Sequence, residues 1–177
     1  RRYKMNLLIH DLNRIEVEKF IGGNDDIKVI SNNNSIRNCM GCFGCWIKTP
    51  GKCVINDGYQ NMGALFGEAE NVIVISRCFY GGYSPFVKNV MDRSIPYLLP
   101  FFKIKQNETH HKQRYHNRFN LIVCFYGSDI SNEEKEIATK LVEANAINFD
   151  ANRLKINFCE NEEEALRKGV SYETHNC

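Results

Sequence analysis

Short apolar runs that read as strands alternate with segments of helical periodicity along the whole chain. The expected strands are 6–10, 27–30, 71–76, 119–125 and 153–158. The expected helices are 14–21, 59–70, 84–98, one that opens with the capping box Ser131-Asn132-Glu133-Glu134, and 161–168. Alternating strands and helices predict right-handed crossovers and a parallel sheet. We therefore expect an α/β fold whose chemistry lies in loops at the carboxyl ends of the strands.

Two long segments interrupt this alternation. Residues 31–58 form a cysteine-rich loop, and residues 100–118 form a basic loop that contains His110, His111 and His116. Loops of this length in a compact domain are usually functional or disordered. For the histidines a solvated loop is the favoured interpretation, and a metal or acidic-group site is the alternative.

Length and charge limit the class of protein. The 177 residues fit one domain, 1–177, in which residues 1–4 precede the first apolar run and are expected to be an appended remnant. The net charge of +2 gives no reason to invoke nucleic acid or a membrane surface, and no apolar run reaches the length of a membrane span. With no targeting segment, we expect a cytoplasmic protein with reduced thiols, and a disulfide scaffold is the minor alternative.

Four of the eight cysteines follow the spacing C-x2-C-x2-C-x7-C, namely Cys39, Cys42, Cys45 and Cys53. Four thiolates suit a [4Fe–4S] cluster or a tetrahedral Zn²⁺, and three thiols two residues apart favour the cluster over zinc. A glycine-rich turn with unligated thiols remains open. Trp46 beside the run either shields a bound group or serves structural packing.

A second candidate site is the exit of the third strand. Residues 76–84 combine aromatic side chains and glycines, and they lead into a helix with Ser84 at the N-cap and Pro85 at its first position. Such a loop can bind a planar, phosphorylated ligand at the switch point of a parallel sheet. An ordinary βα turn with aromatic packing explains the pattern equally well.

The span 38–93 resembles the flavodoxin-like NAD(P)H-dependent FMN reductase family, including its iron–sulfur flavoprotein branch. The matching pieces are the cysteine run, Cys53-Val54-Ile55-Asn56-Asp57, the strand 72–76, and Ser84-x3-Lys88-x3-Asp92-Arg93. The resemblance implies a three-layer α/β/α sandwich with a five-stranded parallel sheet of order 2-1-3-4-5. It also implies a homodimer or homotetramer that takes electrons from NAD(P)H or a protein donor.

The resemblance assigns two sets of site residues. FMN is expected at the carboxyl edge of the sheet, against two loops: Arg77, Cys78, Phe79, Tyr80, Gly81, Gly82 and Ser84 in one, and Tyr126, Gly127 and Ser128 in the other. In the iron–sulfur branch the four clustered cysteines hold a [4Fe–4S] cluster that passes electrons to the flavin. No catalytic side chain is expected, because hydride transfer to the flavin depends on stacking geometry.

One segment departs from the family pattern. His10-Asp11-Leu12-Asn13-Arg14 stands where the family has a glycine- and serine-rich phosphate loop. Asp11 brings a negative charge close to the expected FMN phosphate, and Arg14 or His10 is the candidate for neutralising it. Gly58 also replaces a usual second aspartate, and Arg77 and Phe79 replace a proline and a tyrosine.

These departures keep two other functions open. The domain is alternatively a metal- or partner-binding module without flavin or turnover, or a cysteine-based redox sensor. Lys88, Asp92 and Arg93 share one helix face, where surface ion pairs or an oligomer contact explain them as well as catalysis does.

Overall fold

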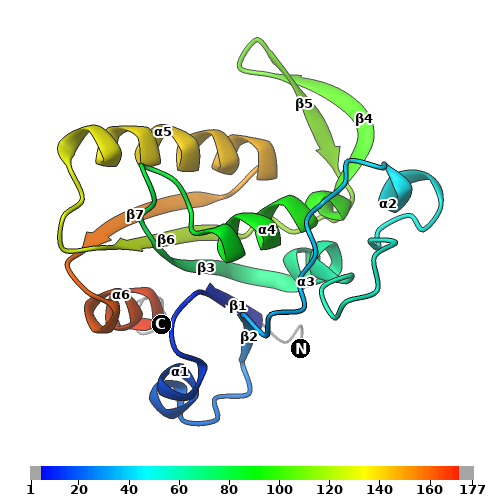
Figure 1. Cartoon of the computed structure of the whole chain (residues 1–177). Coiled ribbons are helices and arrows are strands. Elements are labelled where there is room, and N and C mark those ends of the chain that lie inside the picture. Colours follow the sequence, from blue (N-terminus) through cyan, green and yellow to red (C-terminus); the bar gives the residue numbers. More distant parts are fainter. Residues whose placement is uncertain (1–4, 172–177) are drawn as a thin grey trace.

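The computed structural model describes residues 5–171, so the expected remnant at 1–4 and Cys177 lie outside the described residues. Its centre is a parallel sheet in the order β2-β1-β3-β6-β7 (Figure 1). The strands are β1 (Met5–His10), β2 (Ile27–Ser31), β3 (Ala69–Arg77), β6 (Asn120–Tyr126) and β7 (Arg153–Cys159). The predicted order 2-1-3-4-5 is confirmed, because β4 and β5 form a separate two-stranded sheet.

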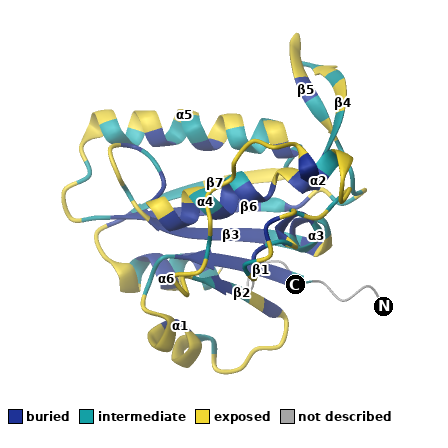
Figure 2. Cartoon of the chain, turned by 45° about the vertical axis from the view of Figure 1, so that its right-hand side comes forward, coloured by how far each residue is buried: buried dark blue, intermediate teal, exposed yellow. Residues whose placement is uncertain are grey.

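Helices cover both faces of the sheet, as the predicted sandwich requires (Figure 2). On one face lie α3 (Met62–Glu68), α4 (Pro85–Arg93) and α5 (Asn132–Phe149), and on the other α1 (Arg14–Ile21) and α6 (Glu162–Val170). Because side chains alternate along a strand, Leu7 and Ile9 of β1 pack towards the first group, whereas Leu8 packs towards the second. Two apolar cores therefore fix the sheet from both sides.

The sequence prediction for 100–118 is wrong over most of its length. Residues 98–113 form an antiparallel hairpin of β4 (Leu98–Lys105) and β5 (Glu108–Gln113). Its turn residues Gln106 and Asn107 both have positive φ, 54° and 62°, which is the backbone of a tight hairpin turn. The sequence pattern does not predict these strands, because the adjacent Phe101 and Phe102 break the expected apolar–polar alternation.

The histidines of this segment are mostly not solvated. His110 is buried, with Nδ1 2.9 Å from Asn148 Oδ1, and His111 Nδ1 lies 2.8 Å from the Leu99 carbonyl oxygen. Only His116, beyond the hairpin, is exposed as expected among these three. The contact with Asn148 ties the hairpin to α5, and the contact with Leu99 joins β5 to β4 within the hairpin.

Two predicted helices are shorter than their patterns. The helix expected over 84–98 ends at Arg93 and is followed by a 3-10 turn, η1 (Ile95–Tyr97), where Pro96 lacks the N–H that a continued helix needs. The helix expected over 59–70 spans Met62–Glu68, since Ala69 already belongs to β3. A short helix, α2 (Gly44–Ile47), lies inside the predicted cysteine loop.

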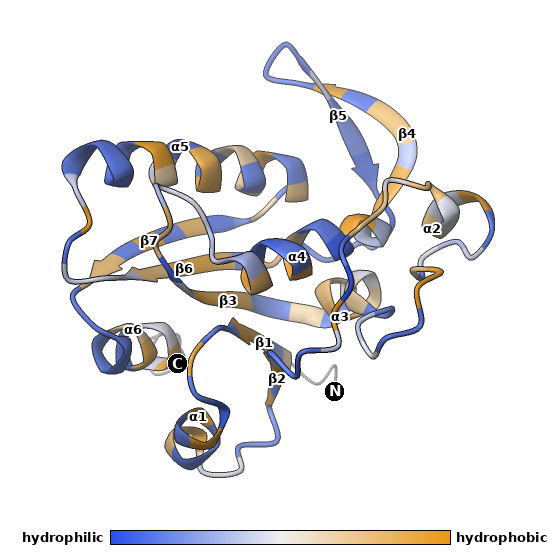
Figure 3. Ribbon diagram, in the orientation of Figure 1, coloured by the Kyte–Doolittle hydropathy of each residue, from blue (hydrophilic) through white to orange (hydrophobic). Residues whose placement is uncertain are grey.

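Hydropathy follows the layers (Figure 3), with apolar residues concentrated in the central strands. A second apolar group is exposed on α2 and β4 and their surroundings: Met40, Phe43, Ile47, Phe101, Phe102 and Ile104. Within residues 5–171, no helix combines the length and the apolar character that crossing a lipid bilayer demands.

Candidate functional site

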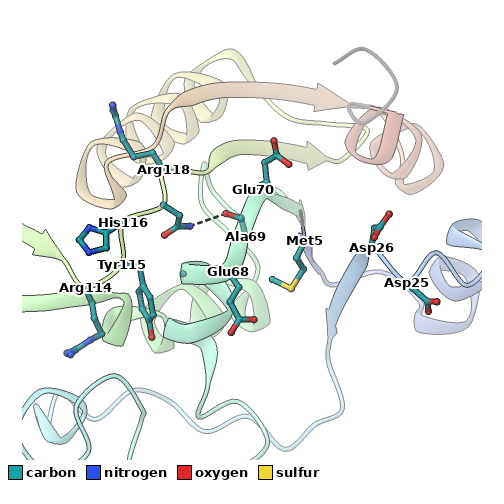
Figure 4. A pocket seen from close by; sticks show the side chains of 12 residues that line it. Met5, Asp25, Asp26, Glu68, Ala69, Glu70, Arg114, Tyr115, His116 and Arg118 are labelled. Atoms are coloured by element: carbon teal, nitrogen blue, oxygen red, sulfur yellow. Dashed lines mark hydrogen bonds between the residues drawn. The ribbon is translucent and has the colours of Figure 1, made fainter. Parts of the chain in front are cut away.

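A broad cavity of about 920 Å³ lies at the amino edge of the sheet (Figure 4). Met5 and Ala69, which begin β1 and β3, line it together with Glu68, Tyr115 and Arg118. Parallel sheets of this topology bind ligands at the opposite, carboxyl edge. Residues 114–118 of the basic segment line this cavity, but none of the residues predicted to bind flavin or metal does. We therefore place the candidate site at the carboxyl edge.

At the carboxyl edge, the loop after β3 is a tight, well-defined turn. The N–H groups of Phe79 and Gly82 donate to each other's carbonyl oxygens at 2.9 and 2.8 Å. Between them, Tyr80 and Gly81 have φ of +50° and +76°. A Cβ on Gly81 would lie 2.7 Å from Ile137 Cβ, so only glycine lets the turn rest on α5. Tyr80 is left at the apex with its side chain exposed.

The two loops expected to hold a flavin lie side by side. The Cys78 N–H donates to the Tyr126 carbonyl oxygen at 3.0 Å, and Arg77 pairs with Tyr126 in the sheet register. The Ser84 N–H donates to Ser76 Oγ at 2.8 Å, which draws the start of α4 onto β3. The residues that sequence analysis assigned to this site are thus brought to one edge, and their contact with a flavin stays a prediction.

Asp11 lies at the switch point between β1 and β3. Its Oδ2 accepts a hydrogen bond from the Arg77 N–H at 2.9 Å, and its Oδ1 accepts one from the Tyr126 hydroxyl at 3.1 Å. Burial raises the pKa of Asp11, and the neighbouring Ser84 hydroxyl and these two donors oppose that rise. The carboxylate therefore bridges two strands and the start of α4.

Neither side chain expected to neutralise Asp11 does so. Arg14 Nε donates to Glu18 Oε1 at 2.7 Å on the exposed surface of α1. His10 is completely buried, and burial lowers its pKa to about 4, so its ring is neutral at pH 7. The compensation comes instead from neutral donors on β3 and β6, which are 66 and 115 residues away in sequence.

The four clustered cysteines line one cavity. Trp46, Ile55, Arg93 and Pro96 also line it. Cys45 is buried on α2, and its thiol pKa is raised to about 11 by burial and by the neighbouring thiols of Cys53, Cys39 and Cys42. Two glycines let the chain wind around this space. Gly41 has φ +62°, and a Cβ at Gly44 would lie only 2.6 Å from Val54 Cγ1.

Four cysteine thiols could serve either a single zinc ion or an iron–sulfur cluster. A single tetrahedral Zn²⁺ draws its thiolates to within about 2.3 Å of one point. Across residues 5–171, no group of three or more His, Cys, Asp or Glu side chains converges in that way. The four cysteines nevertheless line one shared cavity.

A buried ion pair lies beside this cavity. The Arg93 guanidinium, 1% exposed, contacts both Asp57 carboxylate oxygens at 2.8 and 3.0 Å and also donates to the Arg37 and Ile55 carbonyl oxygens. Burial lowers the pKa of Arg93, but the Asp57 carboxylate and the nearby Cys53 thiol outweigh it and raise that pKa. The expected surface position is correct for Lys88 and Asp92, whose pair at 2.6 Å is exposed, and wrong for Arg93.

Trp46 serves packing and also faces the cavity. Its indole N–H donates to the Leu98 carbonyl oxygen at 2.9 Å, and its ring lies 4.9 Å from that of His111. The hairpin, which the sequence pattern did not predict, therefore supports the cysteine segment. Helix α4 joins the two candidate sites. Its N-cap, Ser84, ends the expected flavin loop, residues 77–84, and its last residue, Arg93, lines the cysteine cavity. Nine helical residues span about 14 Å.

Comparison with known proteins supports the fold. No family model matches the chain. An iron–sulfur flavoprotein from Methanocaldococcus jannaschii is 38% identical over 63 residues, which are 36% of this chain and 32% of that protein. The match therefore spans about a third of the length of this curated relative.

Solved structures resemble the whole chain. An NADPH-quinone reductase from P. pentosaceus has a TM-score of 0.59 at 13% identity and covers 98% of this chain and 99% of its own. An azoreductase from Bacillus anthracis has a TM-score of 0.58 at 12% identity, with 96% of both chains covered. General stress protein 14 from Treponema denticola, solved in complex with FMN, has a TM-score of 0.55 at 13% identity, again with 96% of both chains covered. The chain thus has the flavodoxin-like fold of these proteins.

Proposed function

We propose that the chain is an oxidoreductase that holds a flavin at the carboxyl edge of its sheet and a [4Fe–4S] cluster on its four clustered cysteines. It moves electrons from NAD(P)H or a protein donor to an acceptor. The observation that carries the proposal is the pair of sites at the two ends of α4: the flavin loop at Ser84 and the four-cysteine cavity at Arg93. The reductase fold of the neighbours and the iron–sulfur flavoprotein match support it.

Each part of the chain has a physical role in this function. The flavin, when bound, supplies the hydride and electron chemistry, and the protein places and tunes it. Tyr80 and Phe79 offer aromatic surface to a planar ring, and the fixed turn at Gly81 keeps them in place. Cys39, Cys42, Cys45 and Cys53 supply the thiolates, and the buried Arg93 cation offsets part of their charge.

Assembly and location complete the proposal. The exposed apolar residues of α2 and β4 support a homodimer or homotetramer, because apolar patches on soluble proteins commonly mark interfaces. The cytoplasm is the proposed compartment, since thiolates that hold a cluster must stay reduced.

A second candidate function has one specific observation in its favour. Asp11 occupies the switch point with a carboxylate, which disfavours FMN as the family binds it. A module that binds a metal cluster or a partner without flavin would tolerate this residue.

An anaerobic absorption spectrum of freshly purified protein tests the proposal, followed by heat release of bound flavin and iron analysis. Flavin bands over a broad iron–sulfur shoulder, bleached by NAD(P)H or dithionite, are the expected result. A spectrum without flavin bands that no added flavin changes would leave the second candidate in place, and iron-free protein would remove the cluster.

Tyr80→Ala is expected to weaken flavin binding roughly five- to tenfold, because the ring loses one aromatic contact. The fold should persist, since the Tyr80 side chain is 88% exposed. Fluorescence quenching of added flavin gives the affinity, and thermal unfolding verifies the fold. Phe20→Ala, an exposed aromatic on α1, is the matched control, and equal affinities in the two variants would exclude Tyr80 from the site.

A further inference from the structure

The position where a phosphate would bind at the start of α1 is occupied by the chain itself. In doubly wound sheets, the phosphate of a nucleotide rests on the N–H groups at the N-terminus of the helix after β1. Here the Asn13 side-chain oxygen accepts hydrogen bonds from the Ile15 and Glu16 N–H groups at 2.9 and 3.4 Å. These donors already have a partner, the Asn13 side chain.

The neighbouring donors at the switch point serve an internal anion. The Arg77 N–H and the Tyr126 hydroxyl both donate to the Asp11 carboxylate. The Ser84 hydroxyl, at the N-cap of α4, also lies close to it. Asp11 therefore occupies with its own negative charge the place where backbone and hydroxyl donors would otherwise meet a phosphate.

The surroundings add further negative charge. A cavity of about 540 Å³ adjoins Arg77 and Tyr126 at this edge, and its acidic lining residues are Glu16, Asp129, Glu160, Glu162 and Glu163. Among the lining residues within 5–171, Arg77 is the one cation. A dianionic phosphate in this place would meet several like charges and a single opposite one.

A neutral polar side chain lies at the same edge. The His10 ring nitrogens are buried without a hydrogen-bond partner among residues 5–171. His10 is neutral at pH 7, so its ring suits a ligand with uncharged donors and acceptors. The flavin loop, residues 77–84, keeps its tight turn at Tyr80 and Gly81.

We infer that this site selects a flavin without a phosphate, of the riboflavin class, over FMN, with Asp11 as the residue that determines this specificity. The inference rests on the proposed function, because it requires that the flavin loop, residues 77–84, binds a flavin. The family resemblance implies FMN. The inference replaces FMN with a flavin of the riboflavin class, because the FMN phosphate does not fit the residues present. The flavin ring and its redox chemistry are the same in both ligands.

Titration of the purified, flavin-free full chain with riboflavin and with FMN tests the inference. We expect riboflavin to bind at least about tenfold more tightly than FMN in the unchanged protein. Asp11→Asn keeps an oxygen for the Arg77 N–H and removes the charge, so it should raise FMN affinity at least about tenfold and change riboflavin affinity less than about threefold. Asp26→Asn, at the amino edge beside β2, is the matched control and should change neither affinity.

The outcomes separate the two proposals. Tighter binding of FMN than of riboflavin by the unchanged protein would overturn the specificity and leave the flavin function standing. Equal responses of the two flavins to Asp11→Asn would overturn the role of Asp11. Binding of neither flavin by the unchanged protein or by Asp11→Asn would overturn the proposed flavin function together with the inference.

Discussion

Cys45→Ser is expected to remove the iron–sulfur chromophore and most of the bound iron while the flavin site is preserved. Cys45 is the buried member of the four-cysteine cavity, and the thiols of Cys53, Cys39 and Cys42 all lie close enough to influence its pKa. A serine hydroxyl is a harder, weaker ligand than a thiolate and does not satisfy an iron–sulfur cluster. The flavin loop is independent of this loss, because it lies at the other end of α4.

Three measurements distinguish cluster loss from unfolding. Iron and acid-labile sulfide per chain should fall to near zero, flavin affinity should stay within about threefold, and the thermal transition should move down, since a group bound to the native state stabilises it. Cys124→Ala is the matched control, because Cys124 is also buried, on β6, and packs in the core that faces α1 and α6. Full iron content in Cys45→Ser would remove Cys45 from the ligand set.

The sheet could be predicted from the sequence because its strands are continuous apolar runs. Val72, Ile73 and Val74 belong to a continuous apolar run that predicts a strand covered on both faces. The structure buries Val72 and Val74 in one core and Ile73 in the other. The hairpin 98–113 could not be predicted in the same way. Contacts of Trp46 with Leu98 and of His110 with Asn148 hold it to the rest of the molecule, and no local pattern contains them.

The candidate site was predictable as a set of segments and not as a network. Both Asp57 and Arg93 belong to motif pieces that the sequence identified, yet their pairing joins positions 36 residues apart. Asp11 was recognised as a misplaced charge, and its partners on β3 and β6 become adjacent only when the parallel sheet forms. Sequence periodicity reports which face of an element is buried, whereas these polar contacts depend on which loops meet at the sheet edge.

Removing one partner of the buried Asp57–Arg93 pair should destabilise the protein by about 3–5 kcal/mol. Arg93→Met leaves the Asp57 carboxylate buried with backbone donors alone, and it also leaves the carbonyl oxygens of Ile55 and Arg37 without the guanidinium. Urea unfolding in a Cys45→Ser background measures this loss without a contribution from a cluster. The double variant Arg93→Met/Asp57→Asn should recover part of the stability, because no unpaired charge remains.

The same pair predicts how stability depends on pH. Burial would raise the pKa of Asp57, but hydrogen bonds from Arg93, Arg37 and Tyr59 outweigh it and lower the pKa to about 2. An unfolded aspartate titrates near 3.9, so the stabilisation of about 2 kcal/mol is present above about pH 4 and is lost as the pH falls towards 2. Tyr59 and Arg93 stay in one protonation state over this range, so Asp57 is the group in the pair that titrates. The free energy of unfolding of Cys45→Ser is compared with that of Cys45→Ser/Asp57→Asn between pH 5 and 2.5, which isolates this carboxylate. Parallel curves for the two variants would show that Asp57 makes no pH-dependent contribution to stability.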